Sequence, residues 1–99
     1  MSFMSCGIEW ITPDMAHDWL RCGPDNDLVI GTILAGLPDE VEIHTGVKAD
    51  TVRSSECPEL VRQLVLFMLL QRYDIEVTNV DRVVESLTNV VQAMTLGGR

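Results

Sequence analysis

Residues 57–73 have the sequence CPELVRQLVLFMLLQRY, which holds the densest apolar run of the chain. Pro58 suits the first position of a helix, because proline lacks the N–H that a first helical turn leaves unpaired, and Glu59 adds a negative charge that the helix N-terminus favours. The apolar residues that follow point to nearly every side of a helix. Because such a helix is normally surrounded by others, this stretch predicts a central helix over residues 58–73.

A second strongly patterned stretch, residues 80–94, lies C-terminal to this helix. Its apolar residues recur at helical spacing on one side: Val80, Val83, Val84, Leu87, Val90, Val91 and Met94. Its other side is polar, and Thr78 or Asn79 can cap its start. The pattern predicts an amphipathic helix of about four turns. We expect residues 95–99 to form a flexible C-terminal tail.

The N-terminal half predicts two more helices. Thr12-Pro13 is typical of a cap followed by a first helical residue, and Gly23-Pro24 is a stop signal, so we expect a short helix over residues 13–22. A second helix begins at a cap within residues 25–27 and ends near Thr45-Gly46. Pro38 lies inside it and removes a backbone hydrogen bond at a cost of about 3 kcal/mol, which predicts a bend or interruption near Leu37.

Residues 47–57 show no sustained helical period and contain mainly polar side chains. At eleven residues this connection is long for a compact bundle, and loops of that length are often functional. Little in the segment explains how it would be ordered alone. We therefore expect it to become ordered against a neighbouring subunit, with Lys48, Asp50 and Arg53 as candidate interface residues.

Together these elements predict an all-α fold, a small four-helix bundle-like domain with a long loop between its second and third helices. A chain of 99 residues is long enough for one core and too short for two. We expect a single domain over residues 1–99, with residues 1–11 as an N-terminal extension.

The net charge limits the kinds of partner that the chain can bind. Fifteen acidic residues oppose seven basic ones, for a net charge of -8, which repels phosphate backbones and anionic lipid. No stretch reaches the roughly 18 to 20 apolar residues of a membrane span. Residues 1–7 lack the features of a secretion signal, so the expected compartment is the cytosol.

The residues with metal-binding or nucleophilic chemistry form no recognisable motif. The soft ligand types are Cys6, His17, Cys22, His44 and Cys57. Their spacing lacks the close pairs of a zinc site, and three irregularly placed cysteines favour free thiols over disulfides. Cys57, His44 and Asp50 have the residue types of a nucleophilic catalytic trio, but nothing else in the sequence supports that role. We expect no metal, no cofactor and no enzymatic activity.

The order of these elements resembles the head-tail connector, or adaptor, proteins of long-tailed bacteriophages and related prophage DNA-packaging proteins. In that family a short helix follows a threonine cap, as in residues 11–21, and an aspartate-rich turn follows, as in residues 25–27. A long helix ends near a Thr-Gly pair, like Thr45-Gly46. A proline-initiated apolar helix ending in tyrosine is similar to residues 58–73, and a last helix to residues 80–94. The family's second helix is usually continuous, whereas Gly36 and Pro38 interrupt the pattern here.

The resemblance implies a structural virion component with no reaction. Such a protein forms a homo-oligomeric ring of about twelve copies beneath the portal protein, extends the DNA channel and offers a platform to the stopper or tail-completion protein. DNA passes without specific binding, which suits an acidic wall. The implied location is the virion neck, assembled in the host cytoplasm. The C-terminal segment often docks on the portal, so the resemblance points to Thr95, Leu96, Gly97, Gly98 and Arg99.

A different class of function is also compatible with the sequence. A small helical regulatory protein, antitoxin-like or anti-sigma-like, would bind one partner through the apolar side of residues 80–94. The assembly size separates the two hypotheses, because a regulator acts as a monomer or dimer and a connector joins a ring.

Overall fold

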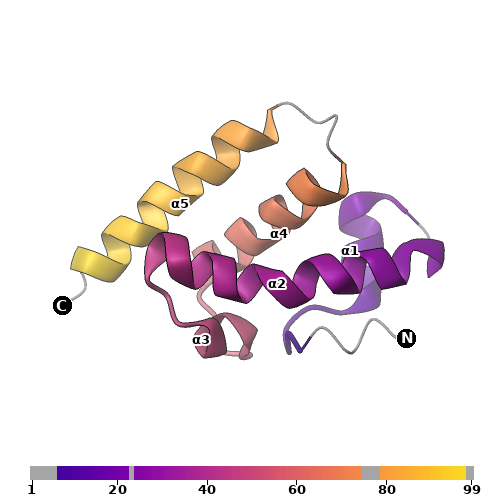
Figure 1. The fold of residues 1–99 in the computed structure, drawn as a ribbon, viewed down its shortest axis with the longest axis horizontal. Coiled ribbons are helices and arrows are strands. Elements are labelled where there is room, and N and C mark those ends of the chain that lie inside the picture. Colours follow the sequence, from indigo (N-terminus) through magenta and orange to yellow (C-terminus); the bar gives the residue numbers. More distant parts are fainter. Residues whose placement is uncertain (1–6, 23, 75–78, 98–99) are drawn as a thin grey trace.

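The computed structural model describes residues 7–22, 24–74 and 79–97, and every regular element in these ranges is helical. The elements are α1 (Pro13–Leu20), the short 3-10 helix η2 (Pro24–Asn26), α2 (Asp27–Thr45), α3 (Ala49–Arg53), α4 (Glu59–Tyr73) and α5 (Val80–Gly97). Figure 1 shows α2 lying across the molecule with α4 behind it and α5 descending toward the C-terminal end of α2. The predicted all-α class is confirmed, with one more short helix, α3, than the sequence pattern indicated.

The central position predicted for residues 58–73 is confirmed. Helix α4 packs against α1, α2 and α5. Its buried side chains are Val61, Leu64, Val65, Met68 and Leu69. Pro58 lies one position earlier than expected, as the residue that precedes the helix, and Glu59 begins it.

The predicted interruption of the second helix is wrong. Helix α2 runs without a break for 19 residues and includes Pro38. The side chains on both sides of that proline, Leu34, Leu37 and Val41, are all 0% exposed, and Pro38 is fully buried as well. Burying several aliphatic side chains contributes about 1.5–3 kcal/mol each, which outweighs the roughly 3 kcal/mol cost of one internal proline.

The predicted long loop is also corrected. Residues 49–53 form the short helix α3, and Val52 and Cys57 are buried. The indole Nε1 of Trp10 donates a hydrogen bond of 2.7 Å to the backbone carbonyl of Val52, and the Glu9 N–H donates to the carbonyl of Arg53 at 2.7 Å. The segment therefore has ordering contacts within its own chain, and the expected role of Lys48, Asp50 and Arg53 at a subunit interface stays a prediction.

The same contacts change the interpretation of the N-terminal extension. Ile8, Trp10 and Ile11 are buried members of the hydrophobic core. Glu9 and Thr12 are exposed between and beside them, and the chain turns at residues 9 and 10, where Trp10 reaches the Val52 carbonyl of α3. Residues 8–11 thus belong to the folded domain, whereas residues 1–6 lie outside the described part of the chain.

Helix α1 begins as the sequence predicts. The hydroxyl of Thr12 accepts a hydrogen bond from the Met15 N–H at 3.2 Å, and the helix ends at Leu20 with Arg21 in the left-handed conformation. Trp19 then fastens α1 to α4, because its indole Nε1 donates to the carbonyl of Leu66 at 2.8 Å. Its ring meets Phe67 edge-on at 5.0 Å.

The expected flexible tail is corrected in part. Helix α5 continues to Gly97, so Thr95 is helical and its hydroxyl donates to the carbonyl of Val91 at 2.9 Å. A Cβ placed on Gly46 would lie 3.4 Å from Cγ2 of Thr95, which brings the C-terminal ends of α2 and α5 together. Gly98 and Arg99 lie outside the described residues.

Candidate functional site

A cleft of about 260 Å³ opens where α2, α4 and α5 meet. Its apolar floor consists of Val41, Leu64, Met68 and Val84, and its polar mouth of His44, Gln71, Arg72, Glu85, Thr88 and Asn89. Apolar floors with a few polar groups at the mouth are the usual make-up of binding clefts. This cleft was not predicted from the sequence, because its walls come from three helices whose packing angles a linear pattern does not specify.

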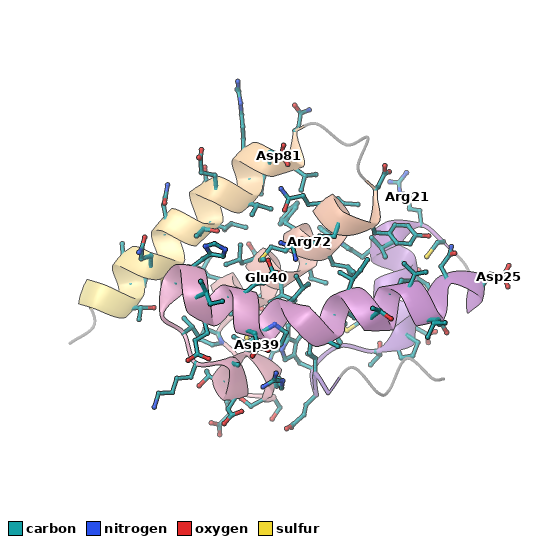
Figure 2. The ribbon with its side chains drawn as sticks, in the orientation of Figure 1. Arg21, Asp25, Asp39, Glu40, Arg72 and Asp81 are labelled. Carbon is teal, nitrogen blue, oxygen red and sulfur yellow. The ribbon has the colours of Figure 1, made fainter. Side chains whose placement is uncertain are left out.

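An ion pair crosses the mouth of the cleft. Both terminal guanidinium nitrogens of Arg72 on α4 donate to the two carboxylate oxygens of Glu40 on α2, and Figure 2 shows the two side chains pointing toward one another. The hydrogen bond from Arg72 lowers the pKa of Glu40, and Glu40 in turn raises the pKa of Arg72. Because both side chains are about a third exposed, water weakens the pair, so it orients α2 and α4 more than it stabilises them.

Several large apolar side chains remain exposed on α1, α2 and α5. They are Met15, Leu28, Val29, Ile43, Val90 and Met94. A single exposed apolar residue is ordinary. Here Ile43 is 77% exposed on α2, and Val90 and Met94 are 46% and 50% exposed on neighbouring turns of α5. Their recurrence along two helices indicates surfaces suited to packing against another helix.

The residues expected at a subunit interface lie together at α3. Lys48 precedes the helix and is exposed, and the Asp50 side chain is fully exposed. A guanidinium nitrogen of Arg53 lies 3.5 Å from Asp50, and the other lies 3.5 Å from Asp39 of α2. These long contacts between exposed groups contribute little to stability, so the charges remain free to meet a partner.

Thr95, the first of the C-terminal residues that the resemblance assigns to portal contact, lies near this cluster. Thr95 is half-buried against Gly46 of α2, and α2 contacts both α3 and α5. Lys48 and Thr95 therefore flank the same end of α2, as Figure 1 shows for the elements that carry them. The fold thus gathers both predicted contact regions at one end of the molecule.

The chemically reactive side chains do not converge. Nε2 of His17 lies 2.6 Å from Oδ1 of Asp27, a pair that links α1 to α2. Burial raises the pKa of the Cys57 thiol to about 11, which leaves it a poor nucleophile near neutral pH. No hydrogen bond joins Cys57 to His44 or Asp50 among the interactions of the described residues. Within ranges 7–22, 24–74 and 79–97, no three metal-binding side chains form a group that could hold an ion.

No helix in the described part of the chain has the length and apolar character needed to cross a membrane. Comparison of the chain with protein-family models, with curated proteins and with solved structures found no match.

Proposed function

We propose that this chain is a structural component of a bacteriophage neck, a head-tail connector that forms a ring beneath the portal protein and extends the DNA channel. The observation that carries the proposal is the order of the helices and where they end. The Thr12 cap, the aspartate-containing turn η2, the Gly46 stop and Tyr73 each fall at a boundary of a helix. These are the landmarks on which the resemblance to connector proteins rests.

The continuity of α2 also supports the proposal. The sequence departs from the connector pattern chiefly by placing Gly36 and Pro38 inside the second helix. In the fold this helix is unbroken from Asp27 to Thr45. The second helix is therefore continuous, as in the connector pattern, although the sequence contains Gly36 and Pro38. The short helix α1 and the long helices α2 and α5 keep the order that the resemblance requires.

The charge of the chain suits a DNA channel. Fifteen acidic and seven basic residues give each copy a net charge of -8. A ring wall of this sign repels the phosphate backbone, so DNA would slide through without being bound. In the proposed arrangement the end of the molecule that carries Thr95, Leu96, Gly97, Gly98 and Arg99 meets the portal. Lys48, Asp50 and Arg53 lie beside this contact at a subunit boundary, and the opposite side of the ring meets the stopper or tail-completion protein.

Electron microscopy tests this function. A virion that contains this chain, or the chain mixed with a candidate portal protein, should show a ring of this protein coaxial with the DNA channel. If neither sample contains such a ring and the chain instead forms a one-to-one complex with another protein, the connector proposal fails.

The proposed portal contact has its own test. Removing residues 95–99 shortens α5 by its last turn, while the buried Val91 stays in place. The truncated chain should keep its helical circular dichroism and lose portal binding in a pull-down. The exchange Gln92→Ala, at an exposed position of the same helix, is the matched control and should leave binding intact. Portal binding by the truncated chain would contradict the assignment.

A second candidate function has a specific observation in its favour. Helix α5 leaves Val90 and Met94 half-exposed, which suits a regulatory protein that holds one partner helix against this side. The stoichiometry of the complex decides between the two: a regulator saturates at one partner per chain, and a connector joins many copies of itself around one axis.

A further inference from the structure

Helix α2 carries an outward-facing strip of exposed residues, and among the described side chains only Arg53 reaches it, at Asp39. We define the α2 strip as Val29, Thr32, Gly36, Asp39 and Ile43, which recur at intervals of three and four residues opposite the buried side of the helix. A Cβ placed on Gly36 would meet nothing within 4 Å. The centre of the strip is therefore shallow and open, and a second helix can approach the backbone closely there.

Desolvation of the α2 strip by a partner would cost little free energy. The Thr32 hydroxyl donates to the carbonyl of Leu28 at 2.7 Å. If a partner covered Thr32, its hydroxyl hydrogen would still have this acceptor. Ile43 and Val29 are 77% and 51% exposed and would lose this exposure beneath a partner. The apolar ends and the small centre together form a surface on which one helix can pack, and the carboxylate of Asp39 within the strip keeps its contact of 3.5 Å with Arg53.

Helix α5 carries a strip of the same spacing. We define the α5 strip as Val83, Ser86, Val90, Ala93 and Met94. Successive members up to Val90 are three and four residues apart, and Ala93 and Met94 follow Val90 by three and four residues. On the other side of the helix, Glu85, Thr88 and Asn89 line the cleft toward α2. The α5 strip thus faces away from the α2 of its own chain, and its side chains are available to another molecule.

The two strips match in register. Val83 precedes Val90 by seven residues, and Ile43 follows Gly36 by seven residues, a separation of about 10.5 Å along a helix. If the helices run antiparallel and Val90 enters the open space over Gly36, Val83 meets Ile43 and Met94 meets Thr32. A large side chain then faces the glycine, as ridge-into-groove packing requires.

The charges beside the strips are complementary. Arg82, exposed at the edge of the α5 strip, has no ion pair among the described residues. In the antiparallel register it arrives beside Glu42 of the second helix. Glu42 is exposed and uses Oε1 to accept the Ala49 N–H at 3.1 Å. Antiparallel helices also place opposite dipole ends together. In a chain with net charge -8, an exposed arginine that meets an exposed glutamate favours this way of bringing two copies together.

We infer that the α5 strip of one copy packs along the α2 strip of a second copy of this chain. The two strips are different surfaces on different helices, so each association leaves one strip of each kind unused. The contact is head-to-tail and can repeat with further copies. The association stands on the two surfaces, and its closure into a ring rests on the proposed connector function.

Two variants, each blocked at one strip, test the inference. Gly36→Glu fills the α2 strip at a position where the protomer has room, and Val90→Glu places a charge in the α5 strip. Gln63→Glu on α4 and Gln92→Glu on α5 add the same charge at exposed positions outside both strips and serve as controls. Sedimentation velocity is measured over a concentration series for each protein alone and for the equimolar mixture of the two blocked variants.

The expected pattern is specific to a head-to-tail contact. The unaltered chain and both controls should form dimers and larger species as concentration rises, and each blocked variant alone should remain a monomer. The mixture should form one heterodimer that does not grow, because the free α5 strip of Gly36→Glu meets the free α2 strip of Val90→Glu. A monomeric unaltered chain at every concentration, or a mixture that stays monomeric, would overturn the inference.

A charge exchange tests the antiparallel register. Arg82→Glu and Glu42→Lys should each weaken association roughly threefold, and the two proteins mixed or combined in one chain should regain it. Equal association by all forms would overturn the register.

Microscopy separates this inference from the proposed function. A ring in the virion whose copies meet through other helices would overturn only the inference. Head-to-tail oligomers in solution, with no density for this chain at the virion neck, would overturn only the connector function.

Discussion

Helices α2 and α5 are of similar length, 19 and 18 residues, yet the fold uses them differently. Helix α2 buries a continuous side, with Ile30, Leu34, Leu37 and Val41 all at 0% exposure. Among the α5 side chains that the structure describes, only Val80 and Val91 are buried, at 5% and 2% exposure, although the helix carries apolar residues on most of its turns.

This difference separates apolar surface that stabilises the single folded chain from apolar surface that is left exposed and available for assembly. The apolar side of α2 is fully covered by α4, α5 and α3, so it stabilises the protomer. The apolar side of α5 is wider than the area that α4 covers. Its uncovered edge is the α5 strip, and burial of that edge would stabilise an assembly instead of the single chain.

The largest predicted effect comes from a cavity in α2. Leu34→Ala removes a side chain with no exposed area and should lower the free energy of unfolding by about 2–5 kcal/mol, through lost burial and the cavity left behind. Urea unfolding followed by circular dichroism measures it. The paired variant Ile43→Ala, on the exposed side of the same helix, should change stability by about 0.5 kcal/mol or less. Similar losses from both would contradict the two-sided description of α2.

Adjacent residues of α5 sharpen the comparison. Val91 is 2% exposed and Val90 is 46% exposed. Val91→Ala should therefore cost about 2 kcal/mol of protomer stability. Val90→Ala should leave thermal unfolding of the monomer nearly unchanged and weaken self-association. If Val90→Ala destabilised the monomer as much as Val91→Ala, the apolar side of α5 would be covered within one chain.

Trp10 tests whether the segment around α3 is held by its own chain. Trp10→Phe removes the hydrogen bond from Nε1 to the carbonyl of Val52 and the larger ring beneath Arg62. The expected loss is about 1.5 kcal/mol, because a buried carbonyl is left without its donor. Hydrogen exchange of the α3 amides should accelerate in the monomer. Unchanged exchange would contradict this and would favour the prediction from the sequence that a neighbouring subunit orders the segment.

The ion pair between Arg72 and Glu40 should have the smallest effect. The folded-state pKa of Glu40 is lowered from its ordinary value of 4.5, so its contribution is present above that pH and is lost as the pH falls through the lower folded value. Because both partners are partly exposed, the contribution should be about 0.5 kcal/mol and should shrink in high salt. Glu40→Gln should remove this part of the pH dependence of urea unfolding, which lies below the ordinary carboxyl pKa of 4.5. A variant with the same pH profile as the unaltered chain would contradict the assignment.

The sequence predicted the elements whose signals are local. The Thr12 cap and the all-round apolar character of residues 60–70 specify α1 and α4 without reference to distant parts of the chain. Helix α5 was predicted from its period in the same way, although its last turn was assigned to a tail. These signals depend on neighbouring residues alone, so a linear reading is sufficient for them.

The elements that were missed depend on distant contacts. Pro38 is tolerated because α3, α4 and α5 surround α2, and α3 is ordered because Trp10 reaches the carbonyl of Val52 across 42 positions of the chain. Neither the tolerance of Pro38 nor the order of α3 can be deduced from the residues next to it in the sequence. The cleft and the two strips likewise require the packing of several helices, although the exposed spacing of Val83, Ser86 and Val90 could have been noticed once the buried side of α5 was known.

Hydrogen exchange of α5 gives the most direct test that its apolar side is completed by assembly. The isolated monomer and the assembled protein are compared amide by amide, with the buried turns of α2 around Leu34 as the internal reference. We predict that amides of residues 83–94 exchange more slowly in the assembly, while the reference amides are already fully protected in the monomer. Equal protection of α5 in both states would contradict the claim.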